Sequence, residues 1–233
     1  MSEPIPTGCT PIDELLGGGF ERGAVTQVYG PPAAGKTNLT LSGAVATAAA
    51  GGTALYIDTE GLSIDRFEQL ASAHASEAQT VEEIASNLII SDALDFQEQQ
   101  EAVKDAAELA PQLDFIVLDS ATGFYRLERT ASEGGETLRA VARQVTHLLS
   151  LARKHDLSVA ITNQVFSDPD SESDRVRPLG GHTLNHWSAA ILRIERFRGG
   201  NRRATLEKHR AKPAGESARF RITNSGLEGV DEP

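Results

Sequence analysis

Short runs of apolar residues alternate with longer amphipathic segments along most of the chain. Apolar runs rich in Val, Ile and Leu predict buried strands, and apolar residues spaced by three and four positions predict helices. The predicted strands are Val25–Tyr29, Ala54–Asp58, Leu88–Ile90, Phe115–Asp119, Ser158–Thr162, Ala190–Arg196, Arg203–His209 and Ala218–Ile222. The predicted helices are Thr37–Ala50, Ser63–His74, Phe96–Leu109 and Glu136–His155. Because strands and helices alternate, the pattern predicts an α/β fold with a mostly parallel central sheet flanked by helices.

The last third of the chain departs from this alternation, since no helix separates its strands. Gly199-Gly200-Asn201 lies between two of them and predicts a hairpin turn. We therefore expect a C-terminal antiparallel extension of the sheet. Two long loops, Gly123 to Gly135 and Phe166 to Gly181, follow the carboxyl ends of strands, where open α/β sheets bind their ligands.

The composition limits the classes of function. The 233 residues suffice for one α/β domain, and the net charge of −11 reflects 33 acidic against 22 basic residues. Such acidity is typical of proteins from a salty cytoplasm, although an ordinary acidic enzyme fits as well. It disfavours a broadly basic nucleic-acid-binding protein and leaves room for a local basic patch.

No part of the sequence predicts a membrane protein or a secreted one. No apolar run is long enough for a membrane-spanning helix. The first six residues carry neither the basic nor the apolar region of a signal peptide, so we expect a cytoplasmic protein. The single Cys9 excludes an internal disulfide.

The clearest chemical motif lies between the first predicted strand and the first predicted helix. Residues 30–37 match the phosphate-binding pattern G-x-x-x-x-G-K-[ST], whose backbone N–H groups cradle phosphates at a helix N-terminus. Lys36 would reach the β- and γ-phosphates, and the Thr37 hydroxyl would ligate Mg²⁺. The competing interpretation is a Gly/Pro turn that precedes a lysine by chance. The predicted ATP-binding residues are Gly30, Pro31, Pro32, Ala33, Ala34, Gly35, Lys36, Thr37 and Asn38.

Polar residues end three other apolar strands. Asp119 would hold Mg²⁺, and Glu60 would act as the base that activates water. The amide of Gln164 could sense the γ-phosphate and relay hydrolysis to the loop that follows. Each has a structural alternative: Asp119 could cap a turn, Glu60 a helix, and Gln164 could bind backbone groups. Asp58, inside its strand, is expected to point elsewhere.

Two cations near the end of a late strand form another candidate site. Lys208 and Arg210 lie two residues apart and would point the same way on a strand. In a ring or filament they could act in trans on the γ-phosphate of a neighbouring subunit. A solvated strand end is the alternative.

Five motifs occur in a fixed order along the chain: Thr7–Gly19, Tyr56–Gly61, Leu118–Ser120, Ile161–Val165 and Pro178–His182. With the phosphate-binding loop, they resemble the ATPase core of the RecA-type recombinases in their archaeal and eukaryotic branch. The resemblance implies a RecA-like P-loop NTPase fold. It also implies that Lys36 and Thr37 serve phosphate and Mg²⁺, Asp119 is the Walker B acid, Glu60 the catalytic base and Gln164 the γ-phosphate sensor.

By the same resemblance, the two long loops would bind DNA. The candidate DNA-binding residues are Arg126, Arg129, Arg175 and Arg177. The second loop also carries four acids between residues 167 and 174, which would repel DNA phosphates, so a mobile solvated loop is the alternative. Ala33 replaces a glycine common in related loops, and we expect its backbone to keep a negative φ.

The chain also departs from full-length recombinases of this branch. Only six residues precede Thr7, so we expect one RecA-like core domain over residues 1–233, without an N-terminal helix-hairpin-helix domain or a Phe-x-x-Ala motif. A core-only relative of this kind resembles the archaeal RadB family, and the acidic composition fits a halophilic member.

The RadB resemblance implies weak ATP hydrolysis and sequence-independent binding to single-stranded or branched DNA. It also implies assistance to the RadA recombinase in recombination and repair, with little or no strand exchange. A Holliday-junction resolvase is a further candidate partner. The alternatives are an active DNA-stimulated strand-exchange ATPase and a regulatory ATPase similar to KaiC or Sms.

Overall fold

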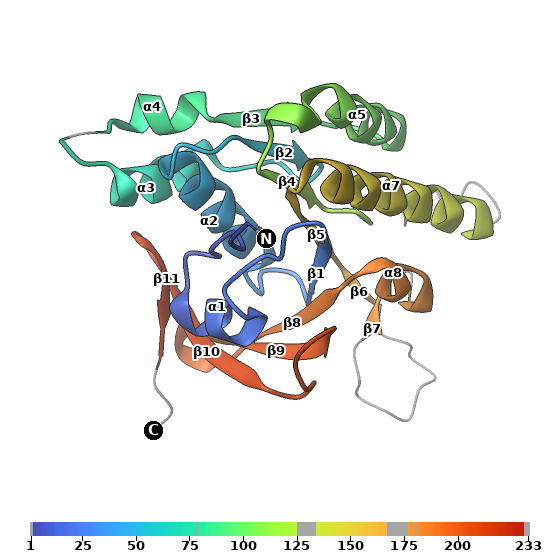
Figure 1. Ribbon diagram of the computed structural model, residues 1–233. Coiled ribbons are helices and arrows are strands. Elements are labelled where there is room, and N and C mark those ends of the chain that lie inside the picture. Colours follow the sequence, from blue (N-terminus) through green and yellow to red (C-terminus); the bar gives the residue numbers. More distant parts are fainter. Residues whose placement is uncertain (1, 78, 125–133, 167–176, 180, 231–233) are drawn as a thin grey trace.

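The computed structural model describes residues 2–77, 79–124, 134–166, 177–179 and 181–230. Its described strands form a nine-stranded sheet in the order β11-β10-β9-β8-β1-β5-β4-β2-β3 and a small two-stranded sheet, β6-β7. The strands are β1 (Val25–Tyr29), β2 (Ala54–Asp58), β3 (Leu88–Asp92), β4 (Phe115–Asp119), β5 (Ser158–Asn163), β6 (Val165–Phe166), β7 (Arg177–Pro178), β8 (Ala190–Arg196), β9 (Asn201–His209), β10 (Ser217–Thr223) and β11 (Gly226–Gly229). In Figure 1 the large sheet extends from β3 at the top to β9 and β10 at the bottom.

The central strands pair in parallel, and the C-terminal strands pair antiparallel, as the sequence predicts. β8, β1, β5, β4, β2 and β3 form the parallel part. β9, β10 and β11 extend it through antiparallel pairs, and the predicted hairpin joins β8 to β9 through Arg198–Gly200. β1 lies between β5 and β8, in the middle of the sheet. The loop after its carboxyl end therefore lies at the edge of the sheet where α/β folds bind their ligands.

Helices cover both faces of the sheet (Figure 1). They are α1 (Thr10–Leu16), α2 (Lys36–Ala49), α3 (Ile64–His74), α4 (Val81–Ser86), α5 (Phe96–Leu109), α7 (Gly134–His155) and α8 (Gly181–Trp187), with a 3₁₀ turn at Ala110–Gln112. The predicted long helices are confirmed within two residues at each end. The sequence interpretation missed α1, α4, α8, β6, β7 and β11.

Two hydrophobic clusters lie on opposite sides of the sheet. On β4, Val117 joins the cluster under α1–α4, whereas Ile116 and Leu118 join the cluster under α5, α7 and α8. Neighbouring residues of a strand point to opposite faces, so a strand covered on both sides is apolar throughout. β1, β2, β4 and β5 are buried along their whole length for this reason. Among the described residues, no helix is long and apolar enough to cross a membrane.

Candidate functional site

The phosphate-binding motif forms a turn between β1 and α2. Gly30 passes so close to β8 that a Cβ there would lie 2.2 Å from the carbonyl oxygen of Ile194. Gly35, with φ of 109°, is the N-cap of α2, and no side chain caps the amides of the first turn. A buried helix N-terminus without a cap is ready to bind an anion. The loop therefore fits a phosphate group.

Lys36 spans this loop from the first turn of α2. Its Nζ donates to the carbonyl oxygens of Gly30, at 3.1 Å, and Pro31, at 3.2 Å. Burial lowers the pKa of Lys36, and the charges of Glu60 and Asp119 oppose that shift. A desolvated ammonium that donates to neutral carbonyl oxygens is better stabilised by an anion, so the predicted phosphate role of Lys36 fits its surroundings.

The backbone conformation of Ala33 differs from the one predicted from the sequence. Its φ is +57°, in the left-handed region, whereas we expected a negative value. The tight turn of the loop selects this conformation, which costs a residue with a Cβ roughly 1–2 kcal/mol relative to glycine.

Ala33→Gly should therefore raise the free energy of unfolding by about 1 kcal/mol, because relief of the strain exceeds the extra entropy of glycine in the unfolded chain. Urea denaturation measures this change. Ala34→Gly is the matched control and should lower stability, because Ala34 is buried and its φ is not positive. An unchanged or lower stability for Ala33→Gly would contradict the assignment of strain.

Asp119 lies at the end of β4, almost fully buried. Its Oδ2 accepts a hydrogen bond from the Tyr56 hydroxyl at 2.6 Å, and its Oδ1 accepts one from Thr162. Burial raises the pKa of Asp119, while hydrogen bonds from Thr162, Tyr56 and Thr37 lower it. The sequence interpretation missed Tyr56 and Thr162, because only the register of β2, β4 and β5 brings them to this carboxylate.

The pair Thr37 and Asp119 fits a magnesium ion. Mg²⁺ in nucleotide sites is usually held by one or two protein oxygens together with phosphate oxygens and water. The described residues contain no group of three or more His, Cys, Asp or Glu that could hold a metal ion. A magnesium ion at this site would therefore need phosphate oxygens and water as further ligands. A buried carboxylate beside a buried ammonium is best satisfied by a ligand that carries both signs of charge, as a magnesium-bound phosphate does.

Glu60 and Gln164 meet although they follow β2 and β5, which are separated in the sheet by β4. Glu60 Oε1 accepts from Gln164 Nε2 and from Ser120 Oγ, both at 2.9 Å. Asp58 has a different task, because its carboxylate accepts the backbone N–H groups of Glu60, Gly61 and Leu62. It thereby shapes the turn that presents Glu60.

Together with the phosphate-binding loop, Glu60 and Gln164 border an open cavity of about 410 Å³. Its lining residues are Pro32, Ala33, Gly35, Lys36, Thr37, Asn38, Glu60, Gln164, Arg196, Arg202 and Ile222. Arg196 ends β8, whereas Arg202 and Ile222 come from the antiparallel extension, and the sequence interpretation missed all three. Their signal in the sequence is weak. Arg196 and Arg202 flank the Gly199-Gly200 turn, but the position of this hairpin beside the phosphate-binding loop depends on the fold.

Arg196 and Arg202 form a cross-strand pair of like charge at the base of that hairpin. Arg202 Nε donates to the Ala34 carbonyl oxygen at 3.0 Å, so it ties β9 to the phosphate-binding loop. Burial lowers the pKa of Arg202, and the charge of Arg196 adds to the effect. The nearby Arg193 and Arg203 pair with carboxylates, whereas no ion pair involves Arg196 in the described part of the chain. Like charges opposite each other are unfavourable, so this pair indicates an anionic ligand.

Arg196→Gln should weaken the affinity for ATP about fivefold, because it removes one exposed cation from the cavity wall and leaves Arg202 in place. Isothermal titration measures the change. Arg198→Gln removes the same charge from the exposed turn beside it and should leave the affinity unchanged. If both variants weakened ATP binding equally, the loss would reflect the net charge of the protein rather than a contact between Arg196 and ATP.

The other predicted sites remain predictions. Arg126, Arg129 and Arg175 lie outside the described residues, and Arg177 begins β7 without a described side chain. Lys208 Nζ donates to the Asn185 carbonyl oxygen at 2.7 Å, and Arg210 pairs with Glu21.

Arg210 lies one residue beyond the end of β9, so the argument from strand periodicity does not extend to it. The same strand begins beside the phosphate-binding loop, where Arg202 lies, and Lys208 and Arg210 lie at its other end. Lys208 and Arg210 therefore do not reach the nucleotide cavity of their own chain. Their action on the γ-phosphate of another subunit is still a prediction.

The fold is the RecA-like P-loop NTPase fold. The family model named Rad51 matches residues 3–230. The chain is 63% identical over 227 residues to the DNA repair and recombination protein RadB of Halobacterium salinarum, with 97% of this chain and 95% of that protein covered. It is 42% identical to the protein of the same name from Methanococcoides burtonii, with 97% and 98% covered.

A solved structure agrees with these relatives. A crystal structure of the RadB recombinase superposes with a TM-score of 0.82 at 37% identity and covers 97% of this chain and 100% of that one. The chain belongs to the Rad51 family and, within it, to the RadB proteins. The relative from Halobacterium agrees with the halophilic archaeal origin that the acidic composition predicts.

Proposed function

We propose that the protein binds ATP with Mg²⁺, binds DNA, and assists a RadA-type recombinase in homologous recombination and repair. ATP hydrolysis would be slow, and the protein would exchange DNA strands little or not at all. The observation that supports this best is the cluster of Glu60, Ser120 and Gln164 beside an intact phosphate-binding loop, in a chain whose relatives are named for DNA repair and recombination. The site of action would be the cytoplasm, and a Holliday-junction resolvase is a second candidate partner.

Each residue of the site has one task in this proposal. The amides of the loop and Lys36 bind phosphate oxygens, and Thr37 and Asp119 hold Mg²⁺, which neutralises the charge of the phosphates. Glu60 takes the proton of the attacking water. The turn closed by Asp58 keeps Glu60 in place at the end of β2.

The hydrogen bonds of Glu60 support slow turnover. Two donors already occupy Oε1, so a water molecule must compete with them or use the other oxygen. Because bound phosphate would compete with Glu60 for the Gln164 amide, the pair could change partners when ATP binds. This exchange would make ATP chiefly a switch.

The backbone around Gln164 offers a route from that switch to the second long loop. The Gln164 carbonyl oxygen accepts the Leu179 N–H at 2.9 Å, and Asn163 Nδ2 donates to the Leu179 carbonyl oxygen at 2.7 Å. A shift of Gln164 would therefore move both β6 and Leu179, which follows β7. These strands flank the segment that we predict to contact DNA.

Strand exchange by a RadA-type recombinase, measured with and without this protein, tests the proposal. The protein should raise the rate or yield of exchange by the recombinase and should give no exchange alone. The nucleotide-site variant Lys36→Ala should lose the stimulation. Exchange by the protein alone would instead identify an active recombinase, and no effect on the recombinase would refute the role of assistant.

A further inference from the structure

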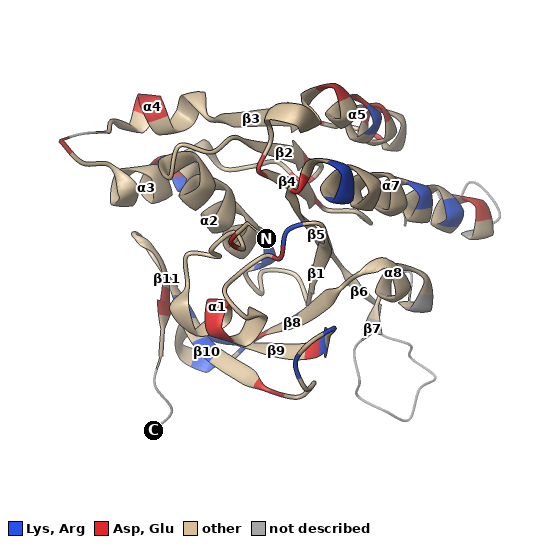
Figure 2. Cartoon of the chain, in the orientation of Figure 1, with Lys and Arg blue, Asp and Glu red and all other residues tan. Residues whose placement is uncertain are grey.

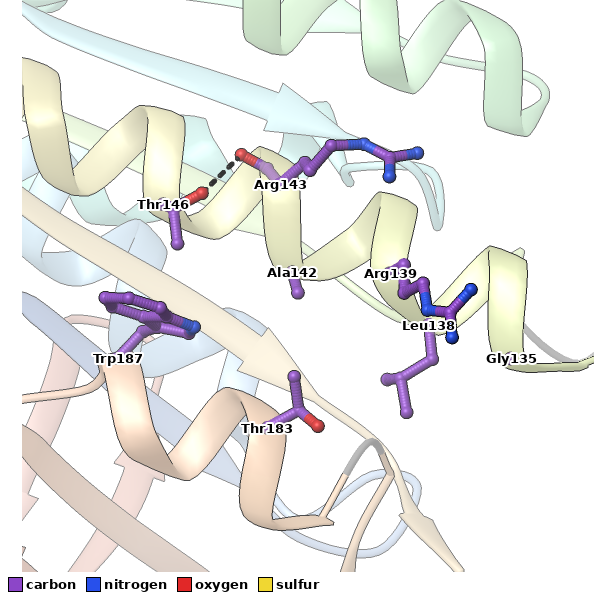
Figure 3. A pocket seen from close by; sticks show the side chains of 8 residues that line it. All are labelled: Gly135, Leu138, Arg139, Ala142, Arg143, Thr146, Thr183 and Trp187. Carbon is purple, nitrogen blue, oxygen red and sulfur yellow. Dashed lines mark hydrogen bonds between the residues drawn. The ribbon is translucent and has the colours of Figure 1, made fainter.

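A second hollow lies away from the nucleotide cavity, between α7 and α8. It has a volume of about 560 Å³, and Figure 3 shows the side chains that line it. They are Gly135, Leu138, Arg139, Ala142, Arg143, Thr146, Thr183 and Trp187. The α7 residues are spaced by three and four positions and so form one stripe along the helix. The hollow is therefore a groove that follows the axis of α7.

The floor and the rim of the groove differ in chemistry. Leu138 and Ala142 form an apolar floor that faces α8 in Figure 3. Arg139 and Arg143 are exposed, four residues apart, and no ion pair involves either of them in the described part of the chain. Like charges at this spacing are unfavourable in a helix. The one nearby acid of α7 is Glu136, one turn earlier.

The groove also contains the only tryptophan of the chain. Trp187 is 39% exposed and lies at the end of α8, where Figure 3 shows its indole directed toward α7. The His186 ring meets it edge-on, with centroids 4.9 Å apart. A large aromatic side chain that the core does not cover is suited to stacking against a flat ligand.

The charge around the groove contrasts with that of the rest of the molecule. The chain carries a net charge of −11, and α5, beside α7, has four acids and one lysine. Figure 2 shows basic residues along α7. An acidic protein repels polyanions over most of its surface, so contact with a polyanion has to use local cations such as these.

We infer that this groove binds single-stranded DNA, with a base stacked on Trp187 and phosphates bound by Arg139 and Arg143. The inference rests on the proposed DNA-binding function and gives it a location outside the two long loops. Stacking on an aromatic side chain beside cations is how single strands are bound without regard to sequence. In a duplex the faces of the bases are already stacked, so the indole favours the single strand.

Because Trp187 is the only tryptophan, its fluorescence reports on the groove directly. The experiment titrates the protein with a dye-labelled oligo(dT) strand, follows binding by anisotropy of the dye, and follows tryptophan emission in parallel with an unlabelled strand. Emission should fall along the same curve as anisotropy rises. A duplex of equal length should quench tryptophan much less.

Paired variants separate the groove from general electrostatics. Arg139→Gln with Arg143→Gln should weaken binding at least about tenfold and reduce the slope of log affinity against log salt by roughly 1.4. Arg153→Gln with Lys154→Gln removes the same charge from the far end of α7 and should have little effect. Trp187→Leu should weaken binding about fivefold. Thermal unfolding checks that each variant folds.

The outcomes distinguish this inference from the function on which it rests. Binding seen by anisotropy, with unchanged tryptophan emission and equal effects of the two double variants, would place DNA elsewhere and overturn the inference alone. No binding by anisotropy would refute the DNA-binding function itself. Emission that changes with a recombinase but not with DNA would make the groove a protein-docking site and overturn the inference.

Discussion

Lys36→Ala should lower the affinity for ATP about 100-fold, because charge-assisted hydrogen bonds from an ammonium to phosphate contribute roughly 3 kcal/mol. The structure gives the reason. Lys36 is almost fully buried, its pKa is lowered by burial, and within the described residues only two carbonyl oxygens accept from it. A phosphate group would be its strongest partner. Isothermal titration with ATP and Mg²⁺ measures the loss.

Lys104→Ala is the matched control for this variant. Lys104 is exposed on α5, away from the cavity, so its removal changes the net charge equally and should leave ATP affinity unchanged. Thermal unfolding without nucleotide should show that Lys36→Ala remains folded, because the shape of the loop also depends on Gly30 and Gly35. Unchanged ATP affinity in the folded variant would show that the nucleotide binds elsewhere.

Glu60→Gln should abolish turnover while it preserves binding. Glutamine keeps the oxygen that accepts from Ser120 and Gln164, so the geometry of the cluster survives. It cannot take a proton from water, and loss of a general base lowers rates by about 100-fold or more. Affinity for ATP should change less than about threefold, since the phosphate-binding loop is untouched.

Single-turnover hydrolysis measures this effect without interference from product release. Glu108→Gln, on the exposed face of α5, removes the same charge and should hydrolyse ATP at the rate of the unaltered protein. Turnover that persists in Glu60→Gln would assign the base to another residue. Loss of binding together with turnover would mean that Glu60 stabilises the bound nucleotide rather than the reaction.

The sequence predicts the parallel part of the fold well because two local signals coincide there. Strands such as β4 are apolar on both faces, so the polar residues at or just after their ends stand out in the sequence. The site residues Lys36, Asp119, Glu60 and Gln164 could be found because each ends or follows such a strand. Their meeting also requires the strand order β1-β5-β4-β2, which brings the carboxyl ends of these strands to one edge of the sheet.

The remaining parts of the site depend on contacts that no local pattern encodes. Arg202 and Ile222 reach the cavity only because β8 pairs with β1, and those strands are separated by most of the chain. Tyr56 and Thr162 meet Asp119 through the register of three strands. The conformation of Ala33 arises from closure of the loop, which overrides the preference of alanine.

The short helices escaped prediction for a related reason. α1, α4 and α8 each contain six or seven residues, too few for a clear helical period. α1 and α8 are fixed by burial of residues such as Ile12 and Leu184 rather than by their own sequence. α4 does carry a local signal, the capping box between Thr80 and Glu83. The sequence interpretation overlooked that signal.

ATP hydrolysis by the purified protein, with and without single-stranded DNA and with Glu60→Gln as the blank, tests the central claim most directly. That claim is that ATP acts as a switch in a protein that assists a recombinase. It predicts slow turnover above the blank that changes little when DNA is added. Strong stimulation by DNA would contradict it and would identify an active recombinase-like ATPase.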